Sequence, residues 1–130
     1  MRYMLDTNAV TCFIKNNQIF IQNLTSVRMS QVCISSVTLG ELNFGLAKRS
    51  NLRLEAIIKG FINNIDVLPW DVNVANDYGK LRANMMSQGK VLAPLDMMIA
   101  AHAFAINATL ITNDKAFSQV PNLRLDDWSK

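Results

Sequence analysis

The chain has 130 residues, the length of one ordinary domain; 50% of them are hydrophobic and 18% are charged. This composition excludes an intrinsically disordered chain and favours a globular fold with a substantial core. The net charge of +3 is mild and the basic residues are spread along the chain, so charge permits a polyanionic partner without requiring one.

The N-terminal segment and the cysteines bear on the cellular compartment. The first apolar run stops at Asp6, too early for a signal peptide, and no stretch reaches the roughly 20 apolar residues that span a bilayer. Cys12 and Cys33 are too few and too widely spaced for a zinc site or a disulfide framework, so we interpret both as small core thiols. We therefore expect a cytoplasmic protein with no membrane contact.

Short β-like runs alternate with helical patterns along the chain. In order, we expect a strand at Tyr3–Leu5, helices at Ala9–Lys15 and within Ile19–Val27, a strand at Val32–Ser35, and helices at Thr38–Lys48 and Leu52–Ile62. There follow a strand at Asp66–Leu68, helices from Val72 to about Gln88 and at Leu95–Ile106, a strand at Thr109–Ile111 and a weaker one at Leu123–Leu125. This alternation is typical of an α/β fold with a mainly parallel central sheet flanked by helices on both faces. Because we find no repeat or linker, we expect a single domain over residues 1–130.

Four of the ten carboxylates lie beside apolar segments, near their ends, where a half-buried charge is costly. Asp6 follows the first strand and Asp114 comes shortly after the fourth. Glu41 lies in about the first turn of the helix that follows the second strand, and Asp96 opens the last long helix. Ligands of open parallel sheets bind outside the carboxyl ends of the strands, so all four acids can converge there. A divalent cation would offset the cost of gathering them.

Each of these acids also has a purely structural interpretation. Asp6 has the position of an N-cap, Asp96 that of a first-turn acid and Asp114 that of a turn residue. Glu41 follows Thr38 at the spacing of a capping box. Four separate coincidences at one sheet edge are less plausible than one shared site, whereas the other six carboxylates fit a solvated surface.

The remaining polar residues disfavour other hydrolytic chemistry. His102 is the only histidine, and we interpret it as a packed or surface residue, which argues against a zinc site built on histidine pairs. Neither a G-x-S-x-G elbow nor a glycine-rich phosphate loop occurs. An all-carboxylate site favours Mg²⁺ or Mn²⁺, and such an ion beside acidic residues indicates phosphodiester hydrolysis.

Taken in order, these motifs resemble the PIN-domain ribonucleases, and within them the VapC toxins of bacterial toxin–antitoxin pairs. The resemblance covers nearly the whole chain and rests on Met4–Asn8, Ile34–Leu42 with Gly45, Gly89, Pro94–Ala103, Thr109–Asp114, Phe117 and Leu123–Trp128.

The resemblance implies a PIN fold and an acidic quartet made by Asp6, Glu41, Asp96 and Asp114 around Mg²⁺, for which Mn²⁺ may substitute. In that family pattern Asp6 and Asp96 are the direct metal ligands, and Glu41 positions or deprotonates the attacking water. Asp114 is the most variable position, since relatives often carry Asn there. Asn8 and Thr112 would be supporting residues that orient the carboxylates, and Ser35 and Ser36 are further polar candidates.

The same resemblance implies an Mg²⁺-dependent endoribonuclease toxin that cleaves RNA, with tRNA favoured, and so inhibits translation and growth. It also implies a cognate VapB-type antitoxin that blocks the acidic pocket, a toxin homodimer and a toxin–antitoxin hetero-oligomer. The first alternative is a non-catalytic PIN-like binding module within a repressor complex. The second is a phosphatase with an aspartyl nucleophile, which is disfavoured because Asn8 stands where that chemistry usually needs a second Asp.

Overall fold

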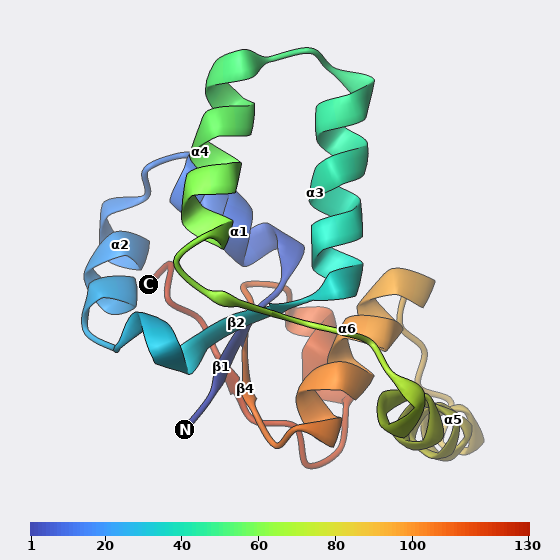
Figure 1. Ribbon diagram of the computed structural model, residues 1–130. Coiled ribbons are helices and arrows are strands. Elements are labelled where there is room, and N and C mark those ends of the chain that lie inside the picture. The colour runs from blue at the N-terminus through green and yellow to red at the C-terminus, as the bar shows by residue number, and fades with distance from the viewer.

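A parallel five-stranded sheet forms the centre of the computed structural model, which describes residues 1–130 (Figure 1). Its strands are β1 (Tyr3–Leu5), β2 (Val32–Ser35), β3 (Asp66–Leu68), β4 (Thr109–Ile111) and β5 (Leu125–Asp126), in the spatial order β3-β2-β1-β4-β5. Every neighbouring pair is parallel. The strand order reverses on either side of β1, which is the place where ligands of such sheets bind.

Helices cover both faces of this sheet. They are α1 (Thr7–Ile14), α2 (Gln18–Thr25), α3 (Ser36–Lys48), α4 (Leu52–Ile62), α5 (Val72–Ser87) and α6 (Pro94–Ala105), with 3₁₀ turns η1 (Met29–Gln31) and η2 (Lys115–Gln119). In Figure 1, α1 to α4 lie on one side of the sheet and α5 and α6 on the other, while α3 and α4 form a hairpin that projects from the sheet. None of the helices has the length and apolar character needed to cross a membrane.

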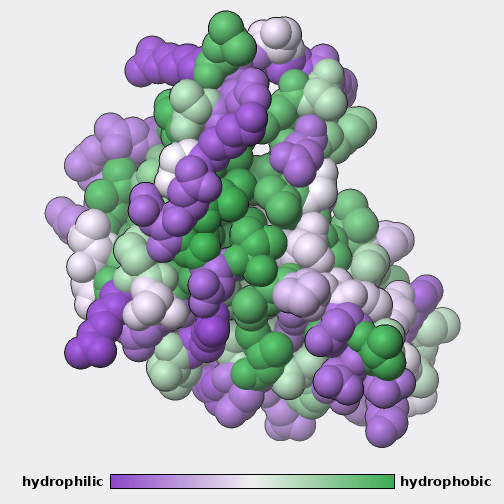
Figure 2. Space-filling model, in the orientation of Figure 1, coloured by the Kyte–Doolittle hydropathy of each residue, from purple (hydrophilic) through white to green (hydrophobic).

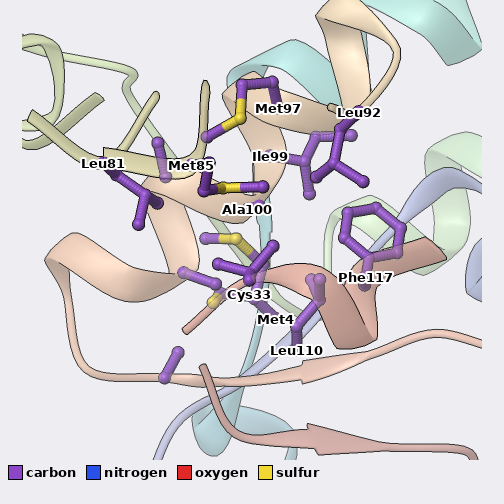
Figure 3. Packing of buried hydrophobic residues seen from close by; sticks show 14 residues of the cluster. Met4, Cys33, Leu81, Met85, Leu92, Met97, Ile99, Ala100, Leu110 and Phe117 are labelled. Carbon is purple, nitrogen blue, oxygen red and sulfur yellow. The ribbon is translucent and has the colours of Figure 1, made fainter. Parts of the chain in front are cut away.

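Alternate residues of the central strands belong to two separate hydrophobic cores, one on each face of the sheet. On one face, Met4 of β1, Cys33 of β2 and Leu110 of β4 pack against α5, α6 and η2 (Figure 3). On the other face, Leu5 and Ile111 pack against residues of α1, α2 and α4. This two-sided burial explains why the strands read as nearly continuous apolar runs rather than as alternating ones.

The fold class and the first four strands were predicted correctly, and the differences lie at the element ends. The helix predicted at Ala9 begins at Thr7, because the Asp6 side chain caps it. The helix predicted at Thr38 begins at Ser36, because the Ser35 hydroxyl accepts the backbone N–H of Val37 and acts as the N-cap.

Two smaller expectations were wrong, and one structural alternative is excluded. The capping box of Thr38 and Glu41 does not form, since the helix begins earlier and the buried Thr38 hydroxyl has no hydrogen-bond partner. The last strand lies at Leu125–Asp126 rather than Leu123–Leu125, where Leu110 N–H bonds the Arg124 carbonyl and sets the register. Cys33 is a buried core thiol as expected, but Cys12 is partly exposed.

The surface between α3 and α4 is apolar. Figure 2 shows hydrophobic residues gathered between these two helices and over the sheet beneath them, with hydrophilic residues on the outer faces. A separate apolar hollow of about 690 Å³ lies between α1, α2 and α4, lined mainly by side chains such as Phe13, Leu24, Val27, Ile57 and Phe61.

Candidate active site

The carboxyl ends of β1 and β4 bring the first two site residues together. Leu5 pairs with Ile111, and the Asp6 N–H donates to the Ile111 carbonyl at 3.1 Å. Asp6 and Thr112, which follow these paired residues, therefore stand side by side at the edge predicted from the sequence. Both are buried, at 3% and 6% exposure.

The Asp6 side chain caps a helix and also lies in surroundings that disfavour its charge. Its Oδ1 accepts the Ala9 N–H at 2.7 Å and so caps α1. Burial raises the pKa of this carboxyl from 3.8 to about 6; the Thr112 hydroxyl and the Ala9 N–H lower it, whereas the charges of Asp96 and Asp114 raise it further. The charged form of Asp6 is thus held in a place that disfavours an anion.

Glu41 and Asp96 come from two helices that begin at the same edge. Glu41 is the sixth residue of α3, two residues deeper than expected, and its Oε1 accepts the Thr7 hydroxyl at 2.6 Å. Asp96 lies in the first turn of α6. Burial raises the pKa of Asp96, and the charges of Asp114 and Glu41 add to the rise, so these acids lie near enough to repel one another.

Asp114 lies in the short segment after β4. Its Oδ1 accepts the Ala116 N–H at 2.9 Å and caps η2, and its own N–H donates to Thr112 Oγ1 at 3.0 Å. Asn8, by contrast, is exposed in the first turn of α1. The structure thus gathers the four predicted acids and Thr112 at one sheet edge and leaves Asn8 at its rim.

The donor set fits a hard divalent cation by ligand type and by charge. As the side chains are placed, no three His, Cys, Asp or Glu residues are arranged to hold a metal ion together. One oxygen each of Asp6, Glu41 and Asp114 accepts a hydrogen bond, which helps to orient these carboxylates. The charges of neighbouring acids raise the pKa of Asp6 and of Asp96, and this is the repulsion that Mg²⁺ or Mn²⁺ relieves.

Several contacts around the site were missed from the sequence. The Thr7 bond to Glu41 joins residues 34 positions apart, and Ser36 Oγ accepts the Trp70 N–H at 3.0 Å. Ser35 Oγ lies 2.8 Å from Nδ1 of His102, so the only histidine is packed, as predicted, but also hydrogen-bonded. Short polar residues at strand ends were a weak signal for Ser35 and Ser36, whereas nothing local marked Thr7 as the partner of Glu41.

A hollow of about 290 Å³ adjoins the acidic edge on the β4–β5 side. It is lined almost entirely by polar residues, including Asp114, Asp126 and the two lysines Lys115 and Lys130. The larger apolar hollow between α1, α2 and α4 contains none of the four acids. Polar chemistry and apolar contact are therefore separated on this surface.

Comparison with known proteins assigns the family. The PIN domain model matches residues 3–123. The chain belongs to the PIN-domain family. Within it the chain is 39% identical over 132 residues to the tRNA(fMet)-specific endonuclease VapC of Shigella flexneri, covering 99% of each chain. It is 37% identical to the protein of the same name from Salmonella typhimurium, covering 98% of each. These identities place it among the VapC ribonucleases.

Solved structures of VapC complexes share this PIN fold. The VapBC2 complex of Rickettsia felis bound to a DNA fragment from its promoter matches with a TM-score of 0.90 and 32% identity, covering 98% of this chain and 99% of that one. DNA-bound VapBC from Salmonella typhimurium matches with a TM-score of 0.91 and 36% identity, covering 98% of each chain. The predicted α/β PIN fold is therefore confirmed.

Proposed function

We propose that residues 1–130 form a single PIN domain that acts as a divalent-metal-dependent endoribonuclease toxin on tRNA in the bacterial cytoplasm and is held inactive by a VapB-type antitoxin. The observation that carries the proposal is that Asp6, Asp96, Asp114 and Glu41 lie together at the carboxyl edge of the sheet, where the charges of their neighbours raise the pKa of Asp6 and of Asp96. Membership among the VapC ribonucleases supports the reaction, and the names of the Shigella and Salmonella relatives support tRNA.

The residues present fit roles in phosphodiester hydrolysis. Asp6 and Asp96 would hold Mg²⁺ or Mn²⁺ through the carboxylate oxygens that face the site, with Asp114 beside them. When bound, such an ion acidifies water and neutralises charge on the scissile phosphate. Without a cation, the Asp6 carboxyl is only partly ionised near pH 6, because its pKa is raised to about 6.

Glu41 is the residue best suited to orient the attacking water and accept its proton. Glu41 lies on α3, whereas Asp6 caps α1, so the two acids come from different helices. The Thr7 hydroxyl occupies only Oε1 of Glu41, which leaves Oε2 free. Thr112 supports Asp6 and also accepts the N–H of Asp114 through its hydroxyl, so it orients two acids at once. Asn8, exposed at the rim, is suited to hydrogen-bond the substrate or a solvent molecule.

The first test replaces Asp6 by Asn. The amide keeps a carbonyl oxygen that can cap α1, but it removes the anion, so we expect a folded protein whose RNA cleavage falls by about 100-fold or more. Growth arrest on induction should be lost with it. The measurement is end-mapping of cellular tRNA after induction of wild type and variant. The control is Glu55→Gln, which removes an acid paired with Lys59 on the surface of α4 and should cleave normally.

Full toxicity of Asp6→Asn would contradict the assignment of this edge as the active site. A wild-type protein that arrests growth without cutting any RNA would instead favour the non-catalytic binding module.

A second test measures metal binding without activity. A cation that binds only the folded state must raise its melting temperature. We expect Mn²⁺ to stabilise wild type but not Asp96→Ala, measured by thermal unfolding across a Mn²⁺ titration. Equal stabilisation of Glu55→Gln and wild type is the control, and equal stabilisation of Asp96→Ala would show that the ion binds elsewhere.

We further propose that the chain assembles with itself and with the antitoxin, as the VapBC structures of its relatives suggest. The apolar hollow between α1, α2 and α4 is the surface that best fits an apolar segment of that antitoxin. It is roughly 690 Å³, its lining is mostly hydrophobic, and Ile57 is 36% exposed within it.

A further inference from the structure

A buried polar pair lies behind the acidic edge, and the proposed mechanism does not use it. Ser35 is 0% exposed and His102 is 1% exposed, and Ser35 Oγ lies 2.8 Å from His102 Nδ1. The two residues are 67 positions apart and belong to β2 and α6. Because polar groups in an apolar core are costly unless paired, their bond fixes how α6 sits against the end of β2.

The same two residues belong to the helices that carry two of the site acids: Ser35 caps the start of α3, and His102 lies in the last turn of α6. Ser35 is the N-cap of α3, where its Oγ accepts the Val37 N–H at 3.1 Å, and Glu41 lies six residues further on. His102 lies six residues after Asp96 on α6. The two helices contact each other, and the charge of Glu41 contributes to the raised pKa of Asp96.

The Ser35 hydroxyl is placed to donate a hydrogen bond to His102. A serine hydroxyl has one proton, and here its oxygen already accepts the Val37 N–H. His102 Nδ1 is the acceptor within reach of that proton. Burial lowers the pKa of His102, although the charge of Asp71 acts in the opposite sense, and a neutral ring with its proton on Nε2 leaves Nδ1 able to accept the Ser35 proton.

We propose that Ser35 and His102 are positioning residues: their buried hydrogen bond joins the N-terminus of α3 to α6 and thereby sets the spacing between Glu41 and Asp96. Neither residue is proposed to touch the RNA or the cation. The inference rests on the proposed function, because its two readouts are RNA cleavage and binding of the proposed cation.

The test exploits the geometry of the histidine ring. His102→Asn places an amide oxygen near the position of Nδ1, where it can accept the Ser35 proton, whereas His102→Gln extends its amide towards the position of Nε2 and cannot. Ser35→Ala and Ser35→Thr provide the same contrast from the other side. Ile99→Val is the control for loss of packing, because Ile99 is a buried residue of the same helix that makes no polar bond.

Two readouts are compared: kcat and KM for RNA cleavage, and the Mn²⁺ concentration that gives half of the maximal rise in melting temperature. We expect His102→Gln and Ser35→Ala to lower kcat by about tenfold or more with KM little changed, and to raise that Mn²⁺ concentration by about tenfold. His102→Asn and Ser35→Thr should recover most of both, and the double variant Ser35→Ala/His102→Gln should lose no more than either single one. Ile99→Val should lower the melting temperature alone.

Equal behaviour of His102→Gln and His102→Asn in folded proteins would overturn the inference, as would a purely additive double variant. If His102→Gln fails to fold, the Ser35→Ala and Ser35→Thr comparison decides in its place. A wild-type protein that binds Mn²⁺ but cleaves no RNA would defeat the proposed function while leaving the Mn²⁺ comparison to judge the positioning role. Absence of any Mn²⁺ effect on wild type would overturn both.

Discussion

At the scale of single residues, Asp6 shows how one side chain serves the fold and the site in opposition. Its Oδ1 caps α1 through the Ala9 N–H, which stabilises the helix. Its burial beside Asp96 and Asp114 destabilises the carboxylate and raises its pKa to about 6. From the sequence, a helix N-cap was the alternative to a site role for Asp6. In the structure, Asp6 caps α1 and also belongs to the cluster of acids, so the two roles do not exclude each other.

This conflict predicts a gain in stability when the charge is removed. The unfolded chain releases the Asp6 proton near pH 3.8 and the folded chain near pH 6, so stability of the metal-free protein should fall as pH rises through this window. The difference corresponds to about 3 kcal/mol at neutral pH. We expect Asp6→Asn, which retains the cap, to be more stable than wild type by about 1–3 kcal/mol at pH 7 and nearly equal to it at pH 3.5.

Urea unfolding without metal at the two pH values measures this. The control is Asp126→Asn, which changes an exposed carboxyl. A wild-type protein more stable than Asp6→Asn at pH 7 would show that the Asp6 carboxylate is not penalised by its surroundings.

At the scale of elements, the termini of helices account for most of what the sequence left unpredicted. Strand positions followed from apolar runs of three or four residues, and four of the five strands have the predicted bounds. Helix starts depended on which polar residue supplies the cap, and for α3 that residue is Ser35 rather than Thr38. The contact of Thr7 with Glu41 depends on the packing of α1 against α3, which no local pattern encodes.

One glycine inside α5 and another just after its end provide a matched pair of predictions. Gly89 follows the end of α5 with φ +71°, a conformation that costs other residues about 1–2 kcal/mol, so Gly89→Ala should destabilise the protein by that amount. Gly79 lies inside α5, where alanine is favoured by about 1 kcal/mol, so Gly79→Ala should stabilise it. A Cβ at either position meets no atom within 4 Å, so backbone conformation alone decides.

Chemical unfolding of both variants and of wild type measures the sign of each change in the free energy of unfolding. Changes of the same sign in both variants would mean that α5 does not end at Ser87 as described.

At the scale of the whole molecule, chemistry and proposed partner contact occupy different surfaces. The acids lie at the carboxyl edge of the sheet, whereas the apolar hollow lies between α1, α2 and α4. From the sequence, parallel topology was enough to gather the acids at one edge. The hollow was not predicted, because it arises from the way α4 packs beside α1 and α2, from which it is distant in sequence.

This separation predicts that partner binding can be impaired without loss of activity. Ile57→Asp places a charge in the apolar hollow, and we expect affinity for the cognate antitoxin to fall by about 100-fold or more, since a buried unpaired charge is costly. RNA cleavage by the free variant should match wild type. Calorimetric titration with antitoxin and a cleavage assay measure the two, and Arg53→Asp, an exposed change elsewhere on α4, is the control.

The double role of Asp6 also has a genetic consequence. Codons for Asp and Asn differ by a single base, and the Asn side chain can still cap α1. Selection against the proposed toxicity would therefore reach, in one mutational step, a well-folded protein that cuts no RNA yet keeps its whole antitoxin-binding surface. Such an allele would compete for antitoxin with an active copy in the same cell, so an inactivating mutation at this position would act as a dominant trait rather than as a simple loss.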